Sequence, residues 1–176
     1  MGARIKLERR GKSLNYRWRL TIFNRLQPLG LSLHTSLPHR PRLDSFSMTT
    51  FTETTAHITV SVEPTPLTED SRPHDGQFVF AYTVTIENRS DQNVQLMERH
   101  WLIESADEQI GEVVGPGVIG LQPIVEPGKH FQYTSSCVIK DPIGAMKGSY
   151  VFRRLTGGFF VVQIPRFRLL YPNSFN

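Results

Sequence analysis

Alternation of apolar and polar character over residues 78–86 constrains this chain more than any other feature of its 176 residues. Large apolar or aromatic side chains occupy every second position there. That is the period of an extended strand with one buried face, and it does not fit the 3.6-residue period of a helix. The residues that share this face are Phe78, Phe80, Tyr82, Val84 and Ile86. The segment therefore predicts a strand whose sheet packs against a second layer.

Short strands of the same kind follow one another along the rest of the chain. The other segments expected to be strands are 57–63, 94–105, 108–114, 130–140, 146–155 and 158–169. Turn-forming clusters separate several of them, at Asn88–Asp91, Glu126–Gly128 and Asp141–Gly144. No segment carries a helical period. Turns spaced by roughly 8–12 residues are typical of an all-β sandwich or barrel.

We therefore expect residues 48–176 to form one all-β domain, an immunoglobulin or fibronectin type III-like antiparallel β-sandwich of seven to eight strands. The chain has a single cysteine, Cys137, so the immunoglobulin disulfide is absent and the fibronectin-type variant is favoured. Alternation in the third expected strand places Met97, Trp101 and Ile103 on one face. No run of about 18 apolar residues is present, which predicts no membrane span.

Residues 1–47 differ in character from the rest of the chain. They hold ten of the 20 Lys and Arg residues and two of the 16 Asp and Glu residues, so this segment carries +8 and residues 48–176 carry −4. Prolines interrupt it and no apolar period persists, which predicts a disordered basic extension. Four interpretations stay open: an upstream start with Met48 as the true first residue, a transit peptide, a basic arm, or an inert tail. The acidic domain does not favour nucleic-acid binding.

The glycines Gly115, Gly117 and Gly120 have the spacing of a dinucleotide fingerprint. That fingerprint requires a helix N-terminus after the glycines, whereas Pro123 and a β-branched pair follow here, so we expect a bend between strands. Two interpretations remain. The glycines supply positive φ in a tight loop, or successive N–H groups bind an anion with help from cations such as Arg99 and Lys129.

Two histidines, His100 and His130, are candidate ligands for a divalent metal, together with Glu98 or Glu104 on the strand that carries His100. The alternative is that they are structural. No spacing typical of a nucleophile paired with a base occurs, and Cys137 reads as a small core residue. We therefore expect no catalytic residue, no enzyme activity and no cofactor.

A set of short blocks carries a family resemblance over residues 50–176. These blocks are Tyr82–Asn88, Val94–Leu96, Arg99–Trp101, Gly115–Gly120, Gln122–Pro123, Pro127–Gly128, Phe131–Ser135, Pro142–Tyr150 and Ile164–Phe167. In order and spacing they resemble the ApaG family. Leu121 stands where that family usually has a polar residue, and Ser136 where it usually has glycine.

The resemblance implies a fibronectin-type β-sandwich without established catalytic activity, associated with cobalt resistance and magnesium efflux. It implies a non-catalytic module that mediates protein interactions and is linked to divalent-cation homeostasis, with an unknown protein partner and a cytoplasmic location. The alternative that it implies is a pyrophosphate- or nucleotide-binding protein that uses the Gly115–Gly120 loop. An exposed edge strand makes a homodimer a further expectation.

Overall fold

The computed structural model describes residues 2–6, 19–23 and 49–172 of the chain. Within the predicted N-terminal extension, β1 (Gly2–Lys6) and β2 (Arg19–Phe23) pair antiparallel. The rest of that extension, and with it the prediction of disorder over residues 1–47, lies outside the described residues.

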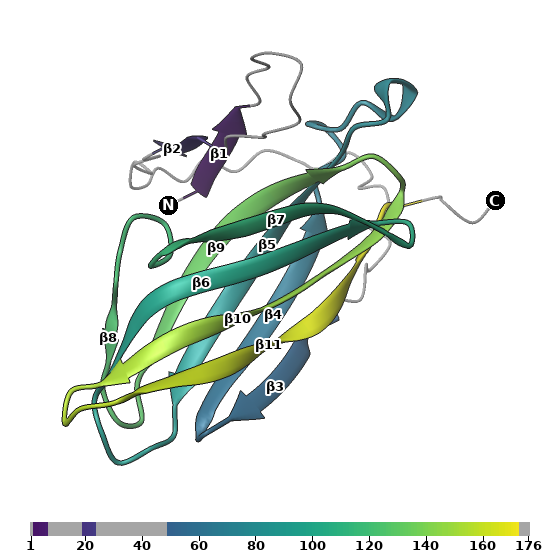
Figure 1. Cartoon of the computed structure of the whole chain (residues 1–176). Helices are drawn as coiled ribbons and strands as arrows, with labels where there is room; N and C mark the ends of the chain where they lie inside the picture. Colours follow the sequence, from purple (N-terminus) through teal and green to yellow (C-terminus); the bar gives the residue numbers. More distant parts are fainter. Residues whose placement is uncertain (1, 7–18, 24–48, 173–176) are drawn as a thin grey trace, which may run out of the picture.

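Residues 51–170 form two antiparallel sheets that pack face to face (Figure 1). The strands of the first sheet are, in order, β3 (Phe51–Thr55), β4 (Ile58–Pro66), β5 (Phe78–Asn88) and β9 (His130–Ile139). The strands of the second sheet are β11 (Phe159–Leu170), β10 (Ile143–Arg154), β6 (Val94–Ser105) and β7 (Glu108–Pro116), and the short β8 (Ile124–Val125) also pairs with β6. The predicted all-β sandwich is confirmed.

Nine strands make up this sandwich in the described part of the chain, where the sequence predicted seven to eight. The strands without a predicted counterpart are β3 and β8. The threonine-rich β3 alternates too weakly to be recognised, and β8 has only two residues. One short 3-10 turn, η1 (Pro73–Asp75), interrupts the loop before β5. None of the described helical segments is long or apolar enough to cross a membrane.

The core lies between the two sheets and is rich in aromatic side chains. Every second residue of β5 is buried, as its alternation predicts. The largest side chains that are fully buried are Tyr150, Phe80, Phe152 and Phe167. Burying a side chain of this size stabilises the fold by about 2–3 kcal/mol each. These rings therefore contribute much of the energy that holds the sheets together.

Strand β6 contains a bulge that changes which of its residues face the core. Val151 and Phe152, consecutive in β10, pair with Glu98 and Leu96, so Met97 is the extra residue. An extra residue shifts the alternation by one position. Leu96 is consequently fully buried, and the prediction that Met97 shares the buried face of Trp101 and Ile103 was wrong.

Several turns follow the chemistry of their residues. In the turn at Glu126–Gly128 the N–H of Lys129 donates to the Glu126 carbonyl at 3.0 Å, and Gly128 has a φ of +70°. This is a type II turn, with proline at the first central position and glycine at the second. The predicted turn at this position is confirmed. Pro165 lies in β11, an edge strand, where the ladder has a register shift.

Candidate functional site

A cavity of about 280 Å³ opens between the two sheets at the edge formed by β7 and β9. The first sheet supplies one wall, with Tyr82 from β5 and Tyr133, Ser135 and Cys137 from β9. Tyr82 and Trp101 pack with their ring centroids 5.5 Å apart. Because each of these edge strands has a neighbour in its own sheet on one side only, the cavity lies at the margin of the sandwich.

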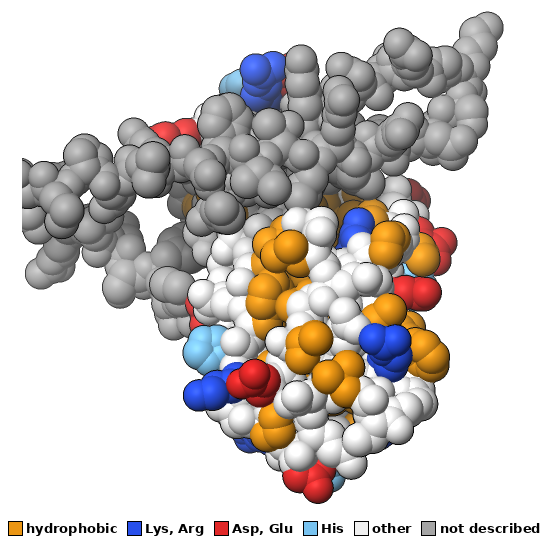
Figure 2. Space-filling model, turned by 90° about the vertical axis from the view of Figure 1, so that its left-hand side faces the viewer, with side chains coloured by type: hydrophobic (Ala, Val, Ile, Leu, Met, Phe, Trp, Pro, Cys, Tyr) orange, Lys and Arg blue, Asp and Glu red, His pale blue; other side chains and the backbone are white. Residues whose placement is uncertain are grey.

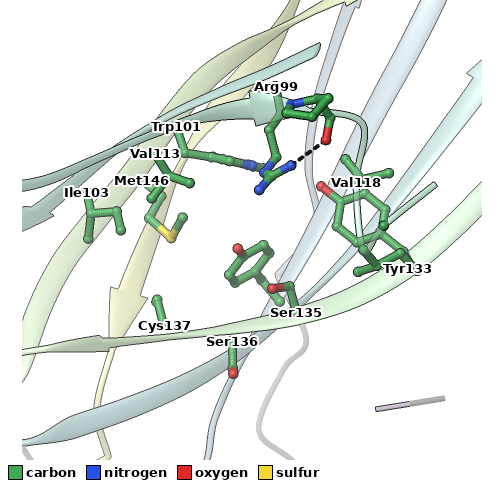
Figure 3. Close-up of a pocket in the computed structure, with 14 residues that line it drawn as sticks. Arg99, Trp101, Ile103, Val113, Val118, Tyr133, Ser135, Ser136, Cys137 and Met146 are labelled. Atoms are coloured by element: carbon green, nitrogen blue, oxygen red, sulfur yellow. Dashed lines mark hydrogen bonds between the residues drawn. The ribbon is translucent and has the colours of Figure 1, made fainter. Parts of the chain in front are cut away.

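Arg99 is the charged residue of this cavity. Its position in β6 has the same parity as Trp101, so its side chain faces the space between the sheets, where it is half-buried. The guanidinium donates from Nη1 to the carbonyl oxygen of Pro116 at 2.8 Å (Figure 3) and to that of Gly117 at 2.7 Å. No carboxylate of the described chain forms an ion pair with it.

The glycine motif forms a tight bend next to Arg99. Val118 and Leu121 exchange two main-chain hydrogen bonds of 2.8 Å, which encloses Ile119 and Gly120 at φ values of +46° and +79°. Two positive φ values in a two-residue loop define a type I′ turn. The next regular element is β8, so the expectation that no helix follows the glycines is confirmed.

Gly117 is required by space as well as by conformation. A Cβ atom at this position would lie 2.0 Å from the carbonyl oxygen of Leu121, and the residue has a φ of +56°. Its N–H donates to the carbonyl oxygen of Met97 at 2.8 Å. The N–H groups of Gly117, Val118 and Leu121 thus all have main-chain acceptors. An anion at the bend would have to compete with these acceptors.

The other residues proposed for anion binding lie at different distances from the bend. Gly115 pairs with Arg99 across the ladder, and its Cα lies beneath the guanidinium. Lys129 is part of the turn before β9, where its carbonyl accepts from the N–H of Asn88, and it does not line the cavity. The structure thus brings Arg99 together with the glycines and leaves Lys129 apart.

The two histidines proposed as metal ligands come from different sheets. His100 in β6 contacts Glu112 in β7, with 2.7 Å between Nε2 and Oε1. His130 begins β9 and pairs with Glu87 of β5. Within residues 49–172 no group of three or more histidine, cysteine, aspartate or glutamate side chains is placed to hold a metal ion.

The cysteine and tyrosine side chains on the cavity wall are held in their neutral forms. Burial raises the pKa of the Cys137 thiol to about 12. Burial also raises the pKa of the Tyr82 hydroxyl, an effect that the positive charge of Arg99 offsets in part. Tyr133 behaves in the same way, with burial as the main cause. At neutral pH the cavity therefore presents one cation, neutral hydrogen-bonding groups and apolar surface.

Sequence reasoning missed the cavity as a unit, although it named Arg99. The signal that could have found it is an arginine at a position that shares the parity of Trp101 and Ile103 on a strand with one buried face. A charged residue facing inward needs a polar or open environment, because its burial without one costs several kcal/mol. Residues 133–137 gave no such signal.

Comparison with known proteins shows the family. The model of the ApaG domain matches residues 68–154. This chain belongs to the ApaG family. It is 44% identical over 119 residues to a protein ApaG from Acidithiobacillus ferrooxidans, and this match covers 68% of this chain and 94% of that protein.

Further relatives agree on the extent of the ApaG match. Protein ApaG from Anaeromyxobacter dehalogenans is 45% identical over 125 residues, covering 71% of this chain and 98% of that protein. A crystal structure described as an ApaA protein from Bordetella pertussis is 44% identical, with a TM-score of 0.64 over 66% of this chain and 95% of that chain. The predicted resemblance to ApaG is confirmed.

Proposed function

We propose that this ApaG chain is a non-catalytic binding module that recognises a protein partner at the margin of its second sheet. The observation that carries the proposal is a set of exposed aliphatic side chains on β7, the glycine bend and β8, which lie along the same side of β6. Val114 is 66% exposed, Leu121 53% and Ile124 51%. With the exposed Pro116 we call these residues the edge strip.

Pairing places the members of the edge strip along one line. Val114 lies opposite His100 in the ladder, Pro116 opposite Glu98, and Ile124 opposite Gln95. Leu121 joins them through the bend that rests on Met97. Figure 2 shows hydrophobic side chains gathered in a band on the side of the molecule that carries the bend and β8. Contiguous exposed apolar surface of this kind is typical of interaction sites.

The character of the cavity supports a role without chemistry. A nucleophile or general base works best when its pKa lies near the operating pH. Cys137, Tyr82 and Tyr133 instead all have raised pKa values through burial, which keeps them protonated at neutral pH. These groups suit the donation of hydrogen bonds and the packing of a ligand.

The link to cobalt and magnesium balance enters this proposal as an indirect one, through the partner. His100 is occupied by Glu112, and His130 stands on the other sheet, so the described residues offer no shared metal site. A module of this kind would act in the cytoplasm on a protein that itself handles the cation.

The experiment compares matched substitutions in the tagged full chain. Leu121→Asp combined with Ile124→Asp places two charges in the edge strip, and Val161→Asp, at a position 49% exposed on β11, is the control. We expect the double variant to lose at least tenfold of a specific partner in quantitative affinity purification while Val161→Asp retains it. Sedimentation velocity shows whether that partner is a second copy of the chain. Equal recovery with all variants would contradict the proposal.

A second candidate function, binding of pyrophosphate or a nucleotide at Gly115–Gly120, is favoured by the position of Arg99 over Gly115. A guanidinium beside a glycine bend can pair with a phosphate oxygen. Calorimetric titration of the full chain with pyrophosphate tests it. Binding that is lost in Arg99→Gln supports this candidate, and the absence of heat at millimolar concentration removes it.

A further inference from the structure

We propose that the cavity between β6, β7 and β9 binds the carboxylate of a small organic acid, with the carboxylate on Arg99 and an apolar group of the acid against the neighbouring wall. Pro116 is the one member of the edge strip that also lines this cavity, and the inference does not rest on the proposed partner surface. It commits to a ligand with one negative charge.

The charge of Arg99 is the first reason. A guanidinium stays protonated at all physiological pH values, and it is held here half-buried between two sheets by the carbonyls of Pro116 and Gly117. Both bonds come from Nη1, and Figure 3 shows the guanidinium pointing into the cavity. In the part of the chain that the structure describes, no acidic residue pairs with it or lines the cavity. The free part of such a fork matches the geometry of a carboxylate, as it does that of a phosphate.

The apolar wall is the second reason. Trp101, Ile103, Val113 and Met146 gather on one side of Arg99 in Figure 3. None of these side chains carries a charge, and all four line the cavity. A cavity with mostly apolar walls and one cation at its side is the usual environment for an organic acid.

Size and charge count decide between this ligand and a polyphosphate. The cavity volume of about 280 Å³ is just below the usual range for ligand sites, roughly 300–1,000 Å³, and so favours a small molecule. Pyrophosphate carries several negative charges, whereas the cavity offers one cation and Lys129 lies elsewhere. Three N–H groups of the bend, those of Gly117, Val118 and Leu121, already donate to the carbonyls of Met97, Leu121 and Val118.

The test uses 3-phenylpropionate as the probe and its amide as the uncharged control. Trp101 lines the cavity, so its fluorescence reports occupation. The chain has two tryptophans, and the full chain with Trp18→Phe leaves Trp101 as the only tryptophan, which is excited selectively over the tyrosines. We expect a saturable change of emission with the acid at submillimolar to millimolar concentration, and at least tenfold weaker binding of the amide.

Matched charge substitutions locate the carboxylate. Arg99→Gln removes the charge inside the cavity and should weaken binding of the acid at least tenfold, to the level of the amide. Arg153→Gln removes the same charge from an exposed position in β10 and should leave the affinity unchanged. If Arg99→Gln does not fold, Arg99→Lys replaces it. Lysine keeps the charge without the fork, so affinity between the two extremes is expected.

A hexapeptide that ends in a phenylalanine carboxylate tells the two sources of this chemistry apart. Binding that depends on Arg99 and is no tighter than that of the free acid supports a small metabolite-like acid. Binding tenfold tighter supports the terminal carboxylate of a polypeptide at the same site. Equal binding of acid and amide overturns the inference, as does equal loss in Arg99→Gln and Arg153→Gln, or binding of pyrophosphate with none of the acid.

Discussion

The two edges of the sandwich are both formed by antiparallel strands, but the sheets pack directly against each other at only one of them. At the edge formed by β3 and β11 the sheets meet directly. Phe51 and Phe167 pack with centroids 6.3 Å apart, and the N–H of Gln163 donates to Oγ1 of Thr55 at 3.2 Å. At the edge formed by β7 and β9 the sheets stand apart around the cavity and Arg99.

The difference teaches that alternation alone does not decide whether a sandwich closes. Large rings fill the gap where β3 meets β11, and a side chain that bridges the strands satisfies an edge N–H. Ser135 and Cys137 on β9 have short side chains. Arg99 faces this gap and donates to the carbonyls of Pro116 and Gly117. One edge is therefore closed by packing, and the other keeps a cavity between the sheets.

The largest effect is expected at the closed edge. Phe167 is fully buried and touches the rings of Phe51, Tyr82 and Trp101. Phe167→Ala should lower the free energy of unfolding by about 4 kcal/mol, because it removes contacts and leaves a cavity. Val113→Ala, at the open edge, should cost less than about 1.5 kcal/mol. Urea unfolding measures both, and equal costs would contradict the distinction between the edges.

A comparable loss is expected for Gly117→Ala at the bend. The added Cβ would collide with the carbonyl oxygen of Leu121, so the bend must open, at a cost of about 3 kcal/mol. Gly120→Ala is the matched control, since its φ is also positive but no atom lies within 4 Å of the new Cβ. There we expect about 1 kcal/mol. Similar losses in the two variants would show that space at Gly117 is not limiting.

Alkaline pH should lower the free energy of unfolding through Cys137, which lines the cavity at the open edge. The pKa of Cys137 is about 12 in the folded chain against an ordinary value of 9.0, so the unfolded thiol ionises first as the pH rises. The stabilising contribution is complete below pH 9 and is lost between pH 9 and 12, by about 1.4 kcal/mol per pH unit. When the free energy of unfolding is measured at several pH values, it should fall less steeply with pH in Cys137→Ala than in the unchanged chain. An unchanged slope would mean that the thiol is not shielded.

The smallest effect is expected on the outer face of the second sheet. Glu104 contacts Lys147 at 2.9 Å and Arg166 at 2.6 Å, and the two cations lower its pKa. Glu104→Gln should cost up to about 1 kcal/mol at pH 7, because ion pairs with exposed partners contribute little. The cost should vanish as the pH falls through the lowered pKa. A cost that persists at low pH would indicate a steric origin.

Much of the fold could be predicted from local pattern, and little of the site could. The alternation of β5 and the proline and glycine of the 126–128 turn are properties of neighbouring residues, so they were visible in the sequence. The bulge at Met97 depends on the pairing of β6 with β10, which no local pattern specifies. The cavity depends on β9 standing opposite β7 across the two sheets, a relation between residues far apart in the chain.

Among the predicted site residues, the structure brings some together and keeps others apart. Arg99 and the glycines came together because pairing of adjacent strands places Arg99 opposite Gly115. His100 and His130 were linked by residue type alone, and the two sheets hold them apart. Residue type thus indicated what each group could do, and strand pairing decided which groups meet.

Ile119 adopts an unfavourable backbone conformation in the bend. A left-handed backbone is strained for a β-branched residue by about 1–2 kcal/mol relative to glycine, and Ile119 nevertheless adopts it with its side chain at the cavity and against the core. Glycine at this position would relax the backbone and take a side chain away from the cavity wall. The room inside the cavity is therefore coupled to a single unfavourable dihedral angle.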